Sequence, residues 1–189
     1  MGVDPGLTRC GVGIVRGGVG TPLELLGVGV IRTPSDLGHG ARLLRIHDGL
    51  EEWFDAHHPD AMAVERVFAQ HNRSTVAGTA QAMGLTQMIG ARHGVAVGVH
   101  TPSEVKAAIS GSGRADKAQV GLMVARVLHL EKPPTPADAA DALALAITHI
   151  WRGGTQSRIE AAMAVHQHSP ARTWRQRSAP RTRQEHHLR

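Results

Sequence analysis

Three strand-like segments in immediate succession open this chain, and after them helical spacing alternates with short apolar runs. A stub at Met1–Asp4 precedes the Val- and Gly-rich segments 10–16 and 23–32, which have the composition of strands. Two further strands are expected at 61–67 and 95–99. Successive strands can pair antiparallel, whereas strands separated by helices favour parallel pairing. The sequence therefore predicts an α/β fold, with a mixed five-stranded sheet flanked by helices on both faces.

Apolar residues recur at helical spacing in the stretches between and after the later strands. The helices are predicted at 42–56, 75–91, 102–109, 115–130 and 136–151. Gly111-Ser112-Gly113 breaks the helical pattern, and Lys132-Pro133-Pro134 is expected to form a rigid link before the last helix.

The basic charge of the chain is concentrated near its C-terminal end. The 189 residues have a formal net charge of +5, but residues 1–151 hold 13 Lys and Arg against 14 Asp and Glu, whereas 152–189 hold 8 against 2. We assign 1–153 to one folded domain and 154–189 to a basic, largely disordered tail. The tail is either an arm that binds phosphates by counterion release or a solvated extension without a dedicated role.

Composition excludes several classes of protein. Cys10 is the single cysteine, so an internal disulfide and a cysteine-based zinc site are excluded, and nothing favours secretion. No apolar run approaches the roughly 18 to 20 residues that a membrane span needs. The N-terminus lacks the pattern of a signal sequence. We therefore expect a cytoplasmic protein without membrane contact.

Two acidic residues are hard to explain by structure alone. Asp4 follows the first strand stub in Gly2-Val3-Asp4-Pro5-Gly6, although Asp-Pro-Gly is also a common turn signal. Glu65 lies within the apolar run 61–67, and a carboxylate buried there is costly unless it is paired or binds a cation. The alternative for Glu65 is a strand end that emerges into solvent beside Arg66.

Two further acids, Asp138 and Asp141, lie three residues apart in an alanine-rich helix. Thr135 suits the N-cap and Pro136 the first helical position, so Asp138 falls in the first turn, where it can simply complement the helix dipole. Asp141 lies beyond that turn. The two side chains share one helix face, and no Lys or Arg on adjacent turns offsets their repulsion. A divalent cation between them would convert that repulsion into binding energy.

Four carboxylates without His or Cys at metal-site spacing suit hard ions that prefer oxygen ligands. Mg²⁺ or Mn²⁺ is therefore expected rather than Zn²⁺. Two such ions about 3.5 to 4 Å apart can stabilise both the attacking water and the leaving oxygen of a phosphodiester. The residues themselves thus favour a nuclease.

Several motifs, taken together and in order, resemble the RuvC family of Holliday junction resolvases. They are Gly2-Val3-Asp4-Pro5-Gly6 with Thr8-Arg9-Cys10-Gly11, Glu65-Arg66-Val67-Phe68, Gly111-Ser112-Gly113-Arg114-Ala115-Asp116-Lys117, and Asp138-Ala139-Ala140-Asp141-Ala142-Leu143-Ala144. The resemblance runs to about Trp151. It implies an RNase H-like fold, a homodimer, and Mg²⁺-dependent nicking of two symmetric strands of a four-way DNA junction. It also implies a branch-migration motor complex as a partner.

The same resemblance implies roles for individual residues. Asp4, Glu65, Asp138 and Asp141 become the catalytic acids, which hold two Mg²⁺ ions per subunit, with Mn²⁺ able to substitute. Cleavage would leave a 5′-phosphate and a 3′-hydroxyl. Some family members have His at the position of Asp138, whereas this sequence has a carboxylate in all four places.

Basic and aromatic residues are also assigned to DNA binding by the resemblance. Lys106 and Lys117 match lysines near the scissile phosphate, and Arg114 lies in a matched motif. Phe68 matches an aromatic residue that stacks on an unpaired base, a contact of about 1 to 3 kcal/mol per base. From spacing alone, the basic residues would be interpreted as solvated charges and Phe68 as a core residue. The glycines of Gly111-Ser112-Gly113 either expose backbone N–H groups to a phosphate or form a plain turn.

Other functions fit the sequence less well. Actin-like sugar kinases also begin with an Asp-x-Gly loop, but they need two phosphate-binding halves, which 151 residues cannot hold. Gly11-x-Gly13 lacks the third glycine of a dinucleotide fingerprint. A non-catalytic junction binder has no reason to keep four acids. The nearest alternative is a nuclease of the same superfamily that acts on RNA.

A dimer interface is expected on the helix at 75–91. Its Gln and Met positions form a face that either contacts a second subunit or packs into the core. These positions are Gln81, Met83, Gln87 and Met88.

The first strand departs from the family pattern. Family members usually carry several more apolar residues before Gly-Val-Asp, whereas only Met1 precedes Gly2 here. The strand that must present Asp4 is therefore expected to be nearly absent. We predict that extending it by three or four residues raises the midpoint of thermal unfolding, and equal midpoints for the two forms would contradict this.

Overall fold

The computed structural model describes residues 1–67 and 73–167, with side chains in 1–67 and 76–153. The chain divides into a compact unit, Met1–Thr155, and a second unit, Gln156–Arg189, of which the structure describes only helical backbone. Within the described ranges, no helix has the length and apolar character that a membrane span needs. The predicted site residues belong to the first unit.

Five strands form one mixed sheet in the order β3-β2-β1-β4-β5. Their bounds are β1 Gly2–Asp4, β2 Arg9–Arg16, β3 Glu24–Arg32, β4 Met62–Glu65 and β5 Val97–His100. The pairs β1–β2 and β2–β3 are antiparallel, and β4 lies parallel to both β1 and β5. The predicted mixed five-stranded sheet is confirmed. β1 has three residues, yet it lies at the centre of the sheet and pairs on both sides.

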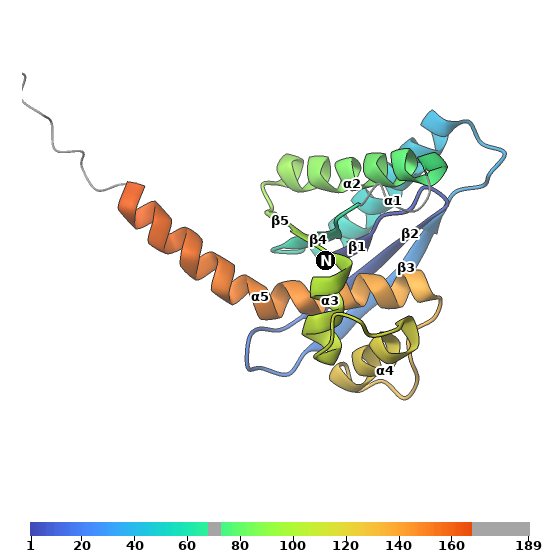
Figure 1. Cartoon of the computed structure of the whole chain (residues 1–189). Helices are drawn as coiled ribbons and strands as arrows, with labels where there is room; N and C mark the ends of the chain where they lie inside the picture. Colours follow the sequence, from blue (N-terminus) through green and yellow to red (C-terminus); the bar gives the residue numbers. More distant parts are fainter. Residues whose placement is uncertain (68–72, 168–189) are drawn as a thin grey trace, which may run out of the picture. The chain divides into compact units, whose positions relative to one another are not determined.

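Helices cover both faces of the sheet, as predicted. Their bounds are α1 His39–His57, α2 Arg73–His93, α3 Pro102–Ser110, α4 Lys117–Val127 and α5 Ala137–Gln167. Figure 1 shows α1 and α2 on one face, with α3, α4 and the first part of α5 on the other. Each strand therefore has side chains that face two different helical layers.

The alternation of side chains along the strands separates two hydrophobic cores. Val3 and Val12 pack with Ile46 of α1 and other residues of the α1–α2 side. Ala63 faces the opposite way and belongs to a core that includes Leu143 of α5. The two cores fix which way every residue of β1 and β4 points.

Glycines on the α5 face of the sheet let that helix lie directly on the strand backbones. A Cβ atom at Gly11 would collide with the carbonyl oxygen of Asp138, and one at Gly2 would collide with that of Ala142. The side chains of α5 along this contact are small as well. Its buried alanines are Ala139, Ala140, Ala142, Ala144 and Ala146. Small residues on both sides therefore set the distance between α5 and the sheet.

Helix α5 begins slightly later and ends much later than predicted. The carbonyl oxygen of Pro136 accepts a hydrogen bond from the Ala140 N–H at 3.4 Å, so Pro136 takes the cap position instead of the first helical position. The helix continues through 154–167, which we had assigned to the tail. Residues 161–164 are Ala-Ala-Met-Ala, all strong helix formers. Residues 168–189 lie outside the described residues, so the disorder of that part stays a prediction.

We expect Gly11→Ala to destabilise the domain by about 3 kcal/mol or more, because the colliding atom is helix backbone and cannot rotate away. Gly40→Ala is the matched control, since Gly40 lies in the first turn of α1 and nothing lies within 4 Å of an added Cβ there. Equilibrium unfolding in urea measures both. A Gly11 variant as stable as the parent would show that α5 does not rest on β2.

Candidate active site

Two of the predicted acids lie side by side at the carboxyl ends of adjacent parallel strands. The register pairs Val3 of β1 with Val64 of β4, and Asp4 and Glu65 are the next residues along these strands. Residues two apart on a strand point to the same face, so Asp4 shares the face of Gly2, which α5 covers. Strand pairing thus directs both carboxylates towards the helix.

Helix α5 brings the other two acids to the same place. Its first turn lies against Gly11, which pairs with Asp4 in the sheet, and a Cβ at Gly11 would lie 3.3 Å from that of Asp4. Asp138 is in this turn, and Asp141 follows one turn later on the same helix face. Asp138, Asp141 and Glu65 all act electrostatically on the Asp4 carboxylate. The structure therefore brings the four predicted acids together.

Burial and mutual repulsion raise the pKa of both strand acids. Burial is the largest cause of the high pKa of Asp4, followed by the charges of Glu65 and Asp141. The pKa of Glu65 is raised first by burial and then by Asp141, while a hydrogen bond with Asp4 lowers it. A hydrogen bond between two carboxyl groups needs a proton on one of them. The Asp4–Glu65 pair therefore retains a proton at pH values where separate carboxyl groups would both be ionised.

Two basic side chains from other elements pair with the acids of α5. Lys117 Nζ lies 2.7 Å from Asp141 Oδ2, and Arg9 Nε lies 2.9 Å from Asp138 Oδ2. This corrects the expectation of uncompensated repulsion, which rested on the neighbouring helical turns alone. The cations come instead from the starts of β2 and α4. The hydrogen bond to Asp141 is also the main cause that raises the pKa of Lys117.

One oxygen of Asp138 is not satisfied by the protein. Its Oδ2 is buried and accepts no hydrogen bond from the described residues, although Arg9 Nε lies at ion-pair distance. The N–H of Arg9 is therefore poorly aligned with this oxygen. A buried carboxylate oxygen without a donor is costly, and a bound cation would satisfy it. The set of four carboxylates fits a hard divalent ion such as Mg²⁺.

The acids border a small hollow that also contains both predicted lysines. It has a volume of about 200 Å³, and Glu65, Asp141, Lys106 and Lys117 line it together with apolar side chains. Lys106 projects from α3 and is half-buried, whereas the side chain of Lys117 is largely exposed. The structure therefore places both lysines beside the carboxylates.

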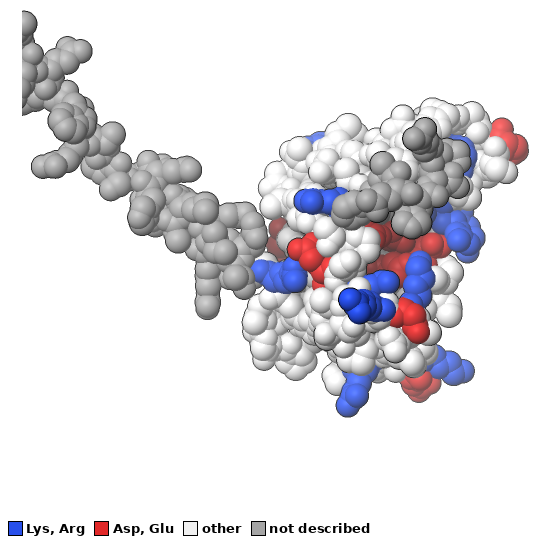
Figure 2. All heavy atoms as spheres, in the orientation of Figure 1, with Lys and Arg blue, Asp and Glu red and all other residues white. Residues whose placement is uncertain are grey.

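A second hollow borders the acids at Asp138. Its volume is about 500 Å³, and it is lined by Asp138 together with the basic residues Arg9, His39 and Arg42. Figure 2 shows acidic atoms recessed near the centre of this face, with basic atoms around them. A negatively charged strand that crossed the acids would meet positive charge in both hollows.

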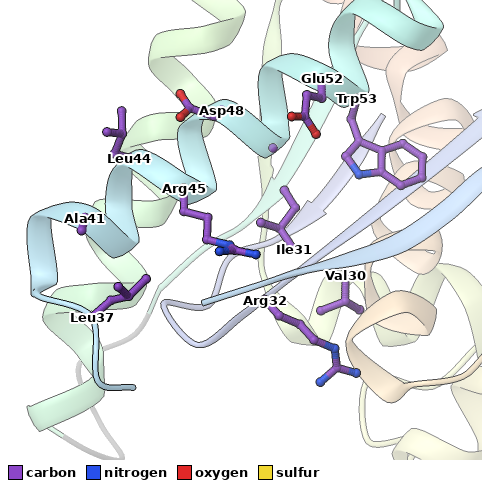
Figure 3. Close-up of a pocket in the computed structure, with 11 residues that line it drawn as sticks. Val30, Ile31, Arg32, Leu37, Ala41, Leu44, Arg45, Asp48, Glu52 and Trp53 are labelled. Atoms are coloured by element: carbon purple, nitrogen blue, oxygen red, sulfur yellow. The ribbon is translucent and has the colours of Figure 1, made fainter. Parts of the chain in front are cut away.

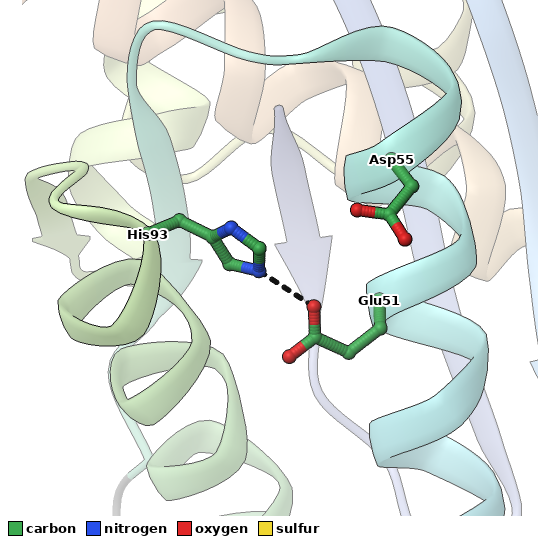
Figure 4. Close-up of side chains that lie close together, drawn as sticks. All are labelled: Glu51, Asp55 and His93. Atoms are coloured by element: carbon green, nitrogen blue, oxygen red, sulfur yellow. Dashed lines mark hydrogen bonds and ion pairs between the residues drawn. The ribbon is translucent and has the colours of Figure 1, made fainter.

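A separate group of potential metal ligands lies between α1 and α2 (Figure 4). One ligand atom from each of Glu51, Asp55 and His93 lies within 4.8 Å of the others. However, His93 Nε2 lies 2.6 Å from Glu51 Oε2, and Arg92 lies 3.5 Å from Glu51 Oε1. The Arg92 cation thus already pairs with Glu51, and this group holds two carboxylates, whereas the site at the strand ends holds four. We interpret the group as an ion-pair contact between the two helices.

A wider hollow lies between β3 and α1 (Figure 3). It has a volume of about 700 Å³ and is lined by apolar residues with Arg32, Arg45, Asp48 and Glu52. None of the four clustered acids lines it. The candidate site is therefore identified by its chemistry and not by the size of its hollow.

Comparison with known proteins identifies the family of this chain. The family model for crossover junction endodeoxyribonuclease RuvC matches residues 1–149. The chain belongs to the RuvC family. RuvC of Cutibacterium acnes is 75% identical over 165 residues, which cover 87% of this chain and 84% of that protein. RuvC of Streptomyces avermitilis is 61% identical over 166 residues, which cover 88% and 94%.

Solved structures of RuvC have the same fold. Thermus thermophilus RuvC in complex with a Holliday junction substrate superposes with a TM-score of 0.77 at 33% identity, covering 82% of this chain and 94% of that chain. A fowlpox virus resolvase bound to Holliday junction DNA has a TM-score of 0.53 at 12% identity, which shows a shared fold alone. The predicted RNase H-like fold and the family resemblance are confirmed.

Arg114, which the resemblance to RuvC assigned to DNA binding, lines neither of the two hollows beside the acids. It is exposed in the turn before α4, where its backbone N–H donates to Ser112 Oγ at 3.3 Å. Phe68 lies outside the described residues. Their roles in DNA binding stay predictions.

The glycines before α4 form a turn. Gly111 caps the C-terminus of α3 with a φ of 77°, a conformation that glycine adopts without strain. The N-terminus of α4 is capped by the Asp116 carboxylate, which accepts a hydrogen bond from the Gln119 N–H at 2.8 Å. A carboxylate thus occupies the helix end that a phosphate would need, and the structure favours the turn over the phosphate site.

The pKa of Asp4 predicts how the pH affects stability when metal is removed by a chelator. A carboxyl group whose pKa is raised on folding binds a proton in the folded state, so stability is lost as the pH rises from about 3.8 through the raised pKa. Asp4→Asn removes this loss. We therefore expect the stability of the variant relative to the parent to increase as the pH rises above about 3.8.

Thermal unfolding in chelator across this range provides the measurement. Asp36→Asn is the control, since Asp36 is an exposed loop carboxylate. Parallel curves for the parent and the Asp4 variant would show that Asp4 is not protonated on folding.

Proposed function

We propose that this chain is a divalent-metal-dependent endonuclease that resolves four-way DNA junctions by paired symmetric nicks. The observation that carries the proposal is a cluster of four acids in a member of the RuvC family. Asp4 and Glu65 come from strand ends, and Asp138 and Asp141 come from α5. The related T. thermophilus structure, which contains a Holliday junction substrate, supports junction DNA as the ligand. Homologous recombination and DNA repair are the processes that such an activity serves.

The four carboxylates are the proposed metal ligands. Mg²⁺ is the expected ion, with two bound per subunit, and Mn²⁺ is expected to substitute. Ions held by these carboxylates would supply the charge that activates a water molecule and stabilises the leaving 3′ oxygen, and cleavage would then give a 5′-phosphate and a 3′-hydroxyl. The unsatisfied oxygen of Asp138 and the mutual repulsion that raises the pKa of Asp4 and of Glu65 both support a cation at this position.

The protein groups around the acids have separate tasks. Asp4, from the central strand, lies among the other three acids. Lys106 and Lys117 line the hollow beside Glu65 and Asp141, where their charges orient the scissile phosphate. We also assign Arg114 to DNA backbone contact and Phe68 to stacking on an unpaired base at the junction centre.

Paired nicks require two active sites, so we propose a homodimer. The core side of α2 consists of Ala82, Thr86 and Ile89, all buried. Its opposite side exposes Gln87 and Met88, the latter with 47% of its surface accessible. Of the other two predicted positions, Gln81 is exposed and Met83 is half-buried. The exposed positions Gln81, Gln87 and Met88 support the predicted interface. A branch-migration motor complex is the proposed larger partner.

We expect Asp141→Asn to abolish cleavage while junction binding is retained, because the substitution removes a metal ligand and leaves the lysines in place. A synthetic mobile four-way junction with Mg²⁺ provides the assay, with products resolved strand by strand. Asp48→Asn, on the exposed surface of α1, is the matched control and should cut like the parent.

The assay also distinguishes the alternatives. The proposal predicts symmetric nicks with Mg²⁺ and none with chelator. Equal cutting of a linear duplex would indicate a general nuclease, and preference for an RNA substrate would favour the alternative within the superfamily. An Asp141 variant that cuts at the parental rate would refute its assignment as a ligand.

A further inference from the structure

We propose that the hollow lined by Arg9, His39 and Arg42 binds a backbone phosphate of the DNA strand that passes the acids, and that Arg9 exchanges between Asp138 and this phosphate. The inference rests on the proposed function. It assigns a phosphate subsite and a positioning role to residues for which the sequence indicated no individual role.

The position of the hollow supports a strand-binding role. Asp138 lines it together with the three basic side chains, so it adjoins the metal-ligand cluster directly. The hollow with Lys106 and Lys117 adjoins the same cluster through Asp141. A strand whose scissile phosphate lies at the acids therefore has basic side chains next to it in both hollows. A DNA backbone, with one negative charge per nucleotide, fits this arrangement.

Arg42 gives the hollow a fixed positive charge. Its Nε donates to Thr33 Oγ1 at 2.9 Å, and a terminal nitrogen donates to Thr8 Oγ1 at 2.8 Å. The Thr33 N–H in turn donates to the Thr8 carbonyl oxygen at 3.1 Å, which ties the loop after β1 to the end of β3. These partners are neutral, and no carboxylate in the described part of the chain pairs with Arg42. Its charge thus remains available to an anion.

Arg9, in contrast, is held loosely. Its side chain is 54% exposed, and its contact with Asp138 lacks hydrogen-bond alignment. A partly exposed ion pair of this kind contributes little to stability. A divalent ion on Asp138 repels the guanidinium, and the hollow that Arg9 already lines is the adjacent place for it. Metal binding at Asp138 therefore frees the Arg9 guanidinium to contact the phosphate. Before the metal binds, Arg9 competes with it for Asp138.

Two titrations test this. With Mn²⁺ alone, in calorimetry, Arg9→Gln should bind the ion about three- to fivefold more tightly than the parent, because a competing partly exposed ion pair is lost. With Ca²⁺ and a labelled four-way junction, Arg9→Gln should bind DNA about fivefold more weakly. The slope of log affinity against log salt should also decrease by about one per subunit, which a merely structural role would not cause.

Arg16→Gln is the matched control. Arg16 lies at the other end of β2 and donates to Glu24 Oε2 at 2.6 Å and 3.1 Å, so the substitution removes the same charge and a similar exposed pair. It should change neither titration. Arg9→Lys, which keeps the charge, should restore most of the junction affinity and the salt slope.

The outcomes separate this inference from the proposed function. Unchanged or weaker Mn²⁺ binding by Arg9→Gln would overturn the competition with metal. An unchanged salt slope would overturn the phosphate subsite. A parent protein that binds no Mn²⁺ at all would refute the metal site itself, and with it the exchange of Arg9.

Discussion

The contact between α5 and the glycine surface of β1 and β2 determines the rest of this structure. A side chain larger than hydrogen at Gly2 or Gly11 would collide with the helix backbone. Because the helix lies this close, Asp138 and Asp141 reach the strand ends that carry Asp4 and Glu65. The packing of α5 on the sheet thus sets the relative positions of the four carboxylates. The same contact also buries the carboxylates, which makes their charges expensive.

The electrostatics of the site follow from that burial. Four carboxylates gather where water is limited, and the protein offsets their charge by three different means. Asp4 and Glu65 retain a proton, Asp141 pairs with Lys117, and Asp138 has a poorly aligned contact with Arg9. Each of these is weaker than coordination of a divalent ion, so the unloaded arrangement favours metal binding. The net charge of the chain, which is basic because of its C-terminal residues, does not reveal this local excess of acid.

The sequence predicted the sheet, the helical layers and the four acids, because each leaves a local signal. Glu65 interrupts an apolar strand, and Asp141 lies beyond the turn in which a helix dipole would explain it. Contacts between residues that are far apart in the sequence leave no such local signal. Arg9 and Arg42 are separated from Asp138 by most of the chain, and only the fold shows that they line one hollow with it. The end of α5 was also missed, because the basic composition of 154–189 suggested a disordered tail, whereas the helix continues to Gln167.

The account depends on the four carboxylates forming one metal site. Anomalous diffraction from a crystal of the full chain soaked in Mn²⁺ tests this most directly, since it locates the ion without reference to activity. We predict anomalous density among Asp4, Glu65, Asp138 and Asp141. Absence of density there, or density at the Glu51–Asp55–His93 group alone, would contradict the account.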